Sequence, residues 1–201
     1  MFLVGLTGNY GMGKSTVLSQ FKKLGAITLD SDKIVESLFS KKKTLEKIRR
    51  VLGNTVFDEH GNLNKKKVAD LIFRNDILKD SIEDILHPLV FERIESFLKT
   101  INNKDAVVVI EVPLLFERGY EGRFDKTVTV FTDEETALHR LEKSGIARDE
   151  TTQRLKSQLP ISVKIKKSDF IIKNNDTLED TMMQVTTIYT KILREAGIGD
   201  N

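Results

Sequence analysis

The sequence contains no cysteine among its 201 residues. Disulfide bonds, a thiolate nucleophile and a cysteine-ligated zinc site are therefore excluded. Histidine is also scarce, and His60, His87 and His139 are spread along the chain, so a histidine-rich metal site is not expected. The chain also has no large excess of either charge, because 32 basic and 30 acidic residues leave a net charge of +2. Nucleic-acid-binding proteins are usually more basic.

Long apolar runs are missing as well. None approaches the roughly 20 residues that span a bilayer, and no cationic segment precedes an apolar one at the N-terminus, so a secretory signal is not expected. Apolar residues make up 39% and charged residues 31%, which suits a packed core under a well-solvated surface. We therefore expect a single soluble domain in the cytoplasm, with no membrane or nucleic-acid partner and no obligate protein partner.

Short apolar runs alternate with helical patterns along much of the chain, which is typical of an α/β fold with a mostly parallel sheet. The run at 106–112 is continuous and rich in β-branched residues, as in a central strand covered on both faces. Further strands are expected at 2–6, 26–29, 127–131 and 170–172. Helices are expected at 17–24 and 31–39, from a capping box at 132–135 to Lys143, and from Asp176 to near Gly197.

Two segments interrupt this alternation. Residues from about 41 to 103 have helical spacing throughout, so we read them as a helical insertion, in which His87-Pro88 is expected to mark a helix boundary. Residues 144–167 are basic and polar around a short helix and are expected to form a lid. The core is then expected at about 1–40, 104–143 and 168–201.

The strongest chemical signal is the segment Gly8-Asn9-Tyr10-Gly11-Met12-Gly13-Lys14-Ser15, which fits the phosphate-loop pattern G-x-x-x-x-G-K-[ST]. It follows an expected strand and precedes an expected helix, which is the context that the motif requires. Its glycines allow a tight turn whose N–H groups, Met12 included, face an anion at the positive end of the helix. Lys14 is expected to reach the β- and γ-phosphates, and Ser15 is expected to bind Mg²⁺. An ordinary glycine-rich turn is the weaker alternative.

The class of phosphate-loop protein follows from what surrounds the motif. A GTPase would carry an Asn-Lys-x-Asp base reader after a strand, but Asn102-Asn103-Lys104-Asp105 lacks the intervening residue and precedes one. A motor ATPase would need more chain. A small-molecule kinase fits the length, with the insertion binding the acceptor and the lid closing over ATP.

Acidic residues stand where ligands of open α/β sheets collect. Asp30 and Asp32 follow the second expected strand, and Glu111 lies near the end of the central one. Asp32 is a candidate to accept a proton from an attacking hydroxyl or to hold a water on Mg²⁺. Helix capping explains Asp30 or Asp32 equally well. A salt bridge explains Glu111 as well as a metal role does.

Arginine and lysine residues between Arg140 and Lys167 are candidates to contact the triphosphate, although a run of charged residues usually just forms a solvated surface. Arg148, Arg154 and Lys164 are the ones that fall in the expected lid. His87 is a candidate to touch a substrate phosphate, but taken alone a capping role is the simpler explanation.

In order along nearly its whole length, the chain resembles the dephospho-coenzyme A kinase family. The resemblance rests on the phosphate loop, on Leu29 to Ile34, on Asp58 to Leu63 with Phe73, on His87-Pro88-Leu89, on Val112-Pro113-Leu114-Leu115-Phe116-Glu117, and on Arg154, Gln158-Leu159-Pro160, Lys164, Ser168-Asp169 and Asn174. Asn9-Tyr10 stands where Gly-Ile is usual in the family, Met12 where Ser is usual, and Ser168 where Ala is common.

The resemblance implies a three-layer α/β/α P-loop NTPase fold and ATP-dependent phosphorylation of the ribose 3′-hydroxyl of dephospho-coenzyme A, with Mg²⁺. Asp32 would be the base or orienter of that hydroxyl and would also act on Mg²⁺ through water. The donor site would be formed by Gly8, Gly11, Met12, Gly13, Lys14, Ser15, Thr16, Arg140 and Arg148. The acceptor would contact Asp32, His87, Pro88, Leu114 and Lys164. A nucleoside or nucleotide kinase of the same fold and a non-catalytic nucleotide switch are the alternatives.

Overall fold

The computed structural model describes residues 1–73 and 75–198. Contacts between residues divide the chain into two compact units. One comprises Met1–Asp30 and the chain from Asn103 onward, and the other is the segment Ser31–Asn102. The first unit contains the sheet and the glycine-rich loop, and the second is helical.

The first unit is built on a five-stranded parallel sheet in the order β2-β3-β1-β4-β5. The parallel sheet predicted from the sequence pattern is thus confirmed. Because every pairing is parallel, the carboxyl ends of the strands lie at the same edge of the sheet. The central strand β1 ends at this edge. The strands are β1 (Phe2–Thr7), β2 (Ile27–Asp30), β3 (Val107–Glu111), β4 (Lys126–Phe131) and β5 (Phe170–Lys173).

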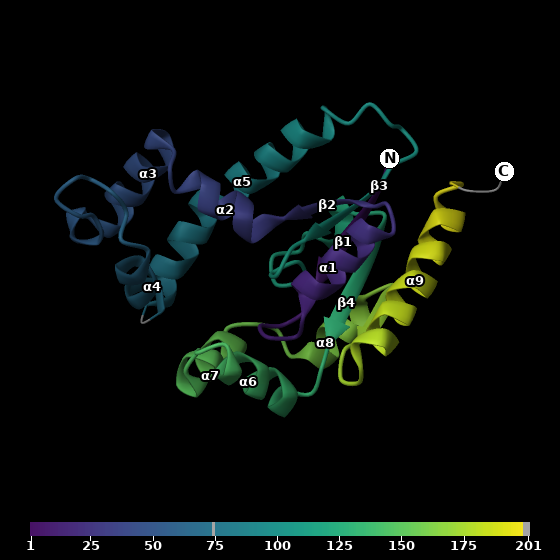
Figure 1. Cartoon of the computed structure of the whole chain (residues 1–201). Coiled ribbons are helices and arrows are strands. Elements are labelled where there is room, and N and C mark those ends of the chain that lie inside the picture. The colour runs from purple at the N-terminus through teal and green to yellow at the C-terminus, as the bar shows by residue number, and fades with distance from the viewer. Residues whose placement is uncertain (74, 199–201) are drawn as a thin grey trace. The chain divides into compact units, whose positions relative to one another are not determined.

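Two helices, α1 (Lys14–Lys23) and α9 (Leu178–Glu195), lie side by side against one face of this sheet (Figure 1). Phe21 of α1 meets Tyr189 of α9 edge to face, with ring centroids 6.0 Å apart. Both rings belong to the main apolar core, together with alternate residues of the strands. Burial of each large apolar side chain contributes about 1.5–3 kcal/mol, so the start of α1 is firmly fixed relative to the sheet.

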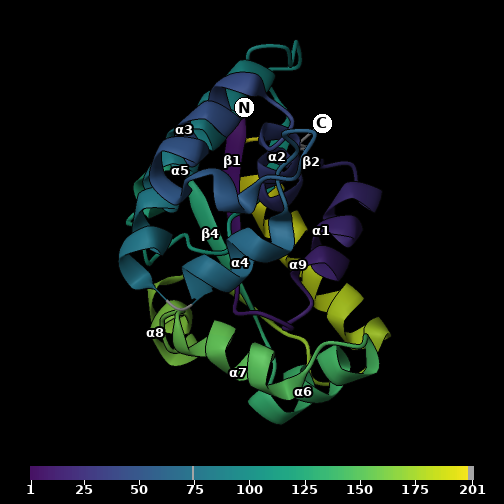
Figure 2. The same ribbon diagram turned by 90° about the vertical axis from the view of Figure 1, so that its left-hand side faces the viewer.

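Two helices, α6 (Glu134–Lys143) and α7 (Arg148–Lys156), follow the carboxyl end of β4, and a third helix, α8 (Ile161–Lys167), packs against β4 itself (Figure 2). The sequence indicates one short helix in 144–167, but the structure has two, separated by Ser157–Pro160. Pro160 is the N-cap of the second, and proline disfavours helix in the residue before it, which explains the break. A 3₁₀ turn, η2 (Glu121–Arg123), precedes β4.

In the helical unit, a long central helix packs against the three others. This unit includes the first helix after β2, which packs against the long helix. Its elements are α2 (Ser31–Leu38), α3 (Lys42–Leu52), the 3₁₀ turn η1 (Asn54–Val56), α4 (Lys65–Phe73) and α5 (Asp76–Leu98).

The helix boundary expected at His87-Pro88 is wrong, because α5 continues through both residues. Buried positions recur every fourth residue across Pro88, so one apolar face is continuous. They are Ile82, Leu86, Val90 and Ile94. Pro88 cannot donate to the carbonyl of Asp84, but both residues are exposed, so water can satisfy that carbonyl.

Two helix starts lie one residue later than the sequence indicates. The N-cap of α6 is Asp133 rather than Thr132, and its carboxylate accepts a hydrogen bond from Thr136 N at 2.8 Å. The capping box of α9 is formed by Thr177 and Asp180. At both places two capping residues stand in succession, and sequence spacing alone does not separate them.

Candidate active site at the carboxyl edge of the sheet

The glycine-rich loop, Gly8–Gly13, connects the central strand β1 directly to α1. Gly8 has φ of 148°, and a Cβ atom there would lie 2.3 Å from the carbonyl oxygen of Val130, so the loop passes close against the end of β4. Among the described residues no side chain caps the start of α1, where Gly13 is the N-cap. The positive end of α1 therefore faces the loop, as an anion site requires.

Lys14 folds back over this loop. Its Nζ donates a hydrogen bond to Asn9 O at 3.2 Å and lies 3.9 Å from Glu111 Oε1. Both side chains are more than nine-tenths buried. The ammonium group is thus held at the loop by a carbonyl and a carboxylate, within reach of an anion bound there.

The strand-end acids are brought together in part. Glu111 at the end of β3 is the register partner of Asp30 at the end of β2. Asp32 is exposed in the first turn of α2, two residues beyond that strand. The sheet therefore aligns Asp30 with Glu111, which is on the strand next to β1, and Asp32 follows Asp30 by two residues.

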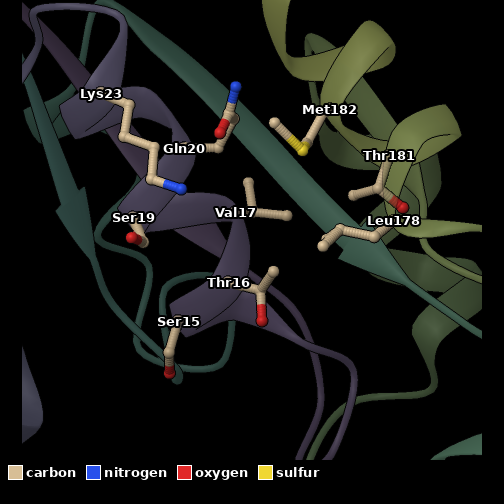
Figure 3. Close-up of a pocket in the computed structure, with 9 residues that line it drawn as sticks. All are labelled: Ser15, Thr16, Val17, Ser19, Gln20, Lys23, Leu178, Thr181 and Met182. Atoms are coloured by element: carbon tan, nitrogen blue, oxygen red, sulfur yellow. The ribbon is translucent and has the colours of Figure 1, made fainter.

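Ser15 and Thr16 are exposed in the first turn of α1. They also line a pocket of about 380 Å³ between α1 and α9 (Figure 3). Val17, Leu178 and Met182 give this pocket apolar walls, and Thr181 lies among them on α9. The anion site and this apolar pocket therefore share the first turn of α1.

The three candidate arginines, Arg140, Arg148 and Arg154, have different surroundings. Arg148 forms an ion pair with Glu135, N to O 3.0 Å, and approaches Glu142 at 3.6 Å, so its guanidinium lies along α6. Arg140 lies in the last turn of α6. Arg154 of α7 stacks over the ring of Tyr10, 4.6 Å from its centroid. Arg154 therefore contacts the glycine-rich loop directly.

The segment between α7 and α8 is tied to the loop by two hydrogen bonds. Tyr10 N donates to Gln158 Oε1 at 2.9 Å, and Asn9 Nδ2 donates to Leu159 O at 3.1 Å. Leu159 N in turn donates to Glu117 Oε1 at 3.0 Å. Asn9 and Tyr10 therefore join the glycine-rich loop to the segment between α7 and α8.

Lys164 is completely buried beneath this segment. Its Nζ lies 2.7 Å from Glu117 Oε1 and donates to Pro113 O at 3.0 Å. Burial lowers the pKa of its ammonium group, the nearby charge of Lys14 lowers it further, and Glu117 opposes both. Lys164 thus fastens α8 to the segment after β3, a role that spacing did not indicate.

Three further expected residues belong to other elements. Leu114 is half-buried in the segment after β3, and His87 and Pro88 lie on α5 of the helical unit. Sequence reasoning gave no role to Glu117, Gln158 or Asn174. The one available signal was their place in the family pattern, which says that they matter but not what they contact.

Among residues 1–73 and 75–198, no group of three or more His, Cys, Asp or Glu side chains is arranged to hold a metal ion. No helix in this part of the chain has the length and apolar character needed to cross a membrane.

Comparisons with known proteins agree over nearly the whole chain. A family model described as dephospho-CoA kinase matches residues 2–180. A dephospho-CoA kinase from Aquifex aeolicus is 35% identical over 193 residues, which cover 96% of this chain and 98% of the relative.

Solved structures show the same likeness. The protein TT1252 from Thermus thermophilus has a TM-score of 0.82 and 29% identity, covering 94% of this chain and 97% of its own. A dephospho-CoA kinase from Campylobacter jejuni has a TM-score of 0.69 and 26% identity, covering 96% and 98%.

Proposed function

This chain belongs to the dephospho-CoA kinase family, and we propose that Lys14 and the loop around it hold the donor while Asp32 directs the acceptor. The reaction transfers the γ-phosphoryl group of ATP to the ribose 3′-hydroxyl of dephospho-CoA and gives CoA, the last step of CoA biosynthesis. The observation that carries this function is the family match over residues 2–180, far beyond the loop itself. A nucleoside or nucleotide kinase of the same fold is not favoured, because such a kinase would share little more than the loop and the sheet.

The donor phosphates are assigned to the loop and the start of α1. Backbone N–H groups between Gly8 and Gly13 form the nest, and Lys14 adds a positive charge beside the β- and γ-phosphates. The position of Lys14 Nζ, 3.2 Å from Asn9 O, supports this assignment. During transfer the bond from the γ-phosphorus to the bridging oxygen breaks, and charge spreads over oxygens that these groups already face.

The acceptor hydroxyl is assigned to Asp32. A carboxylate there can accept the hydroxyl proton while the oxygen attacks phosphorus in line with the departing ADP. Its exposure in the first turn of α2 leaves the carboxylate accessible to a substrate. Asp30, paired in register with Glu111, is assigned a supporting role at the same edge.

The residues present fit Mg²⁺. The ion prefers oxygen ligands and usually combines one or two carboxylates with substrate phosphates. Ser15 offers an exposed hydroxyl at the start of α1, and Glu111 and Asp32 offer carboxylates at or just beyond strand ends. Bound there with ATP, Mg²⁺ supplies positive charge that neutralises the β- and γ-phosphate oxygens.

The segment 144–167 is assigned the role of lid. Its ties to Asn9 and Tyr10 place Arg154 beside the loop, and Arg140 and Arg148 stand on or next to α6. Closure of this lid keeps water from competing with the acceptor hydroxyl.

The helical unit, with His87 and Pro88, is assigned to the coenzyme A portion of the acceptor, together with Leu114. Lys164, being fully buried, is assigned the role of holding α8 in place next to that site. No protein, membrane or nucleic-acid partner is part of the proposal. We place the enzyme in the cytoplasm, because ATP and dephospho-CoA are both highly charged small molecules that do not cross bilayers unaided.

The test is coupled ADP release with ATP, Mg²⁺ and a panel of acceptors that contains dephospho-CoA, adenosine and AMP, with the product identified by mass. We expect ADP release with dephospho-CoA and a product that carries one added phosphoryl group. Equal or faster release with adenosine or AMP would replace the proposal with the nucleotide-kinase alternative.

A further inference from the structure

The phosphate loop is anchored by a side chain from the other end of the sequence. Asn174 Nδ2 donates a hydrogen bond to the carbonyl oxygen of Met12 at 3.0 Å. Both residues are more than nine-tenths buried. Asn174 directly follows β5, and its own backbone N donates to Phe131 O at 2.8 Å. The anchor is therefore itself fixed to the edge of the sheet.

Anchoring this carbonyl also aims an N–H group. The carbonyl of Met12 and the N–H of Gly13 belong to one trans peptide, in which the two groups point in opposite directions. Because the Met12 oxygen is turned toward Asn174, the Gly13 N–H is turned away from it, and the proposed function assigns that N–H to the donor phosphates. The side chain of Asn174 thus sets the direction of a donor it does not touch.

The close approach at Gly13 supports this arrangement. Gly13 has φ of 87°, in the left-handed region that glycine adopts without strain. A Cβ atom built there would lie 2.1 Å from Asn174 Nδ2. The amide of Asn174 therefore packs directly on the α-carbon of the residue whose N–H it orients, and any side chain at Gly13 would displace it.

Thr181 sets the orientation of the Asn174 amide. Its hydroxyl donates to Asn174 Oδ1 at 2.9 Å, and a second acceptor, Thr177 O, lies farther away at 3.2 Å. Thr181 is 2% exposed. With Oδ1 taken by this hydroxyl, the NH₂ group faces Met12 O. If the Asn174 amide were flipped, its Oδ1 would face the carbonyl oxygen of Met12 and the two oxygens would repel each other.

We propose that Asn174, oriented by Thr181, is a positioning residue for ATP binding that acts through the Met12 carbonyl on the N–H of Gly13. The inference rests on the proposed function, since it treats the loop as the site of the donor phosphates. It assigns a task to the first turn of α9, because Thr181 lies one turn into that helix and also lines the pocket against α1 (Figure 3).

The experiment compares Asn174→Ala, Asn174→Asp and Thr181→Val by calorimetric affinity for a non-hydrolysable ATP analogue. Loss of one net hydrogen bond corresponds to about tenfold in affinity. We expect about tenfold weaker binding for Asn174→Ala and more for Asn174→Asp, whose carboxylate faces a carbonyl. For Thr181→Val we expect about threefold, with Thr181→Ser close to the unaltered protein. The KM for ATP should rise with these losses, and the KM for dephospho-CoA should not.

Two further measurements separate positioning from general stability. Thr186→Val is the matched control, because it removes an α9 hydroxyl that bonds its own helix at Met182 O. In the unaltered protein the Gly13 amide proton should move downfield when the analogue binds, and in Asn174→Ala this shift should be smaller. In an Asn174→Ala background, Thr181→Val should cost little more.

Analogue affinity within twofold of the unaltered protein in folded Asn174→Ala would overturn the inference. An undiminished effect of Thr181→Val in the Asn174→Ala background would do the same. If Asn174→Asp fails to fold, the other variants still decide. Binding is measured without acceptor, so a protein that binds the analogue but does not phosphorylate dephospho-CoA overturns the proposed function alone.

Discussion

The ammonium group of Lys164 lies 2.7 Å from Oε1 of Glu117, and this pair joins α8 to the segment that follows β3. The lysine side chain is fully buried and that of Glu117 is 12% exposed, so neither charge is well solvated. The same carboxylate oxygen accepts from Leu159 N, next to the residues that hold the phosphate loop. One ion pair therefore secures both ends of the segment 159–164.

We predict that Lys164→Met destabilises the protein by about 3–5 kcal/mol, because it leaves the Glu117 carboxylate without its partner in a poorly solvated place. Urea unfolding measures the change. The double variant Lys164→Met, Glu117→Gln should be more stable than the single one, since the amide keeps an acceptor for Leu159 N and carries no charge. Equal midpoints for the single variant and the unaltered protein would show that the pair contributes nothing.

Lys14→Ala should reduce phosphoryl transfer by roughly a hundredfold or more, because the loop loses the ammonium group that faces the transferring phosphate. The fold should survive, and thermal melting checks this. Lys22→Ala, in the exposed last turn of the same helix, is the matched control and should keep full turnover. Normal turnover of folded Lys14→Ala would remove the loop from the mechanism.

Asp32→Asn should cut turnover strongly and change ATP affinity little, because an amide keeps the shape of the carboxylate but cannot take the hydroxyl proton. As a helix-capping acid alone, Asp32 would instead contribute about 0.3–1 kcal/mol of stability and nothing to chemistry. Asp30→Asn is the internal comparison. Turnover, analogue binding and melting of both variants distinguish the roles. A lower melting point with unchanged turnover for Asp32→Asn would direct attention to Glu111.

Hydrogen exchange over 144–167 should slow when an ATP analogue and dephospho-CoA bind together, since closure of the proposed lid would bury its backbone.

Tyr10→Leu should speed exchange at 154–159 about two- to fivefold in the nucleotide-free protein, because the stacking of Arg154 on the ring contributes about 0.5–1 kcal/mol. Tyr10→Phe keeps the ring and should restore slow exchange. A segment that exchanges at one rate in all these states would be a fixed surface rather than a lid.

Asp133, the N-cap of α6, should make the free energy of unfolding depend on pH. Hydrogen bonds from the N–H and hydroxyl of Thr136 lower the pKa of the Asp133 carboxyl below its ordinary value. A carboxyl with a lower pKa in the folded state stabilises the protein above its ordinary pKa, and this contribution disappears as the pH falls through the folded value. Between about pH 5 and about pH 2, the unaltered protein should therefore lose stability relative to Asp133→Asn. If the melting temperatures of the two proteins changed equally over this pH range, the prediction would be wrong.

The sheet and the loop were predictable because they depend on local signals. The β-branched run 106–112 indicates a covered strand, and the loop motif indicates a strand before it and a helix after it. The strand-end acids were predictable as a group for the same reason, since parallel strands bring their carboxyl ends to one edge.

The continuity of α5 was not predictable, because proline's local preference is overridden by the apolar face that runs past Pro88. The contacts of Lys164 and Asn174 depend on segments far apart in the sequence, and no local pattern specifies them. Arg148 shows the same limit: its charge indicated a phosphate contact, but spacing could not show that Glu135 lies beside it.

The central place of β1 in the sheet bears on how the chain matures during synthesis. Phe2 pairs with Val107 and Val4 with Lys126, so β1 has neither neighbour until long after it leaves the ribosome. The helical unit Ser31–Asn102 emerges in full before that moment. The anchor of the Met12 carbonyl, Asn174, emerges later still. Because such distant pairings form late, a nascent chain carries the complete loop motif for most of its synthesis without yet being able to bind a nucleotide.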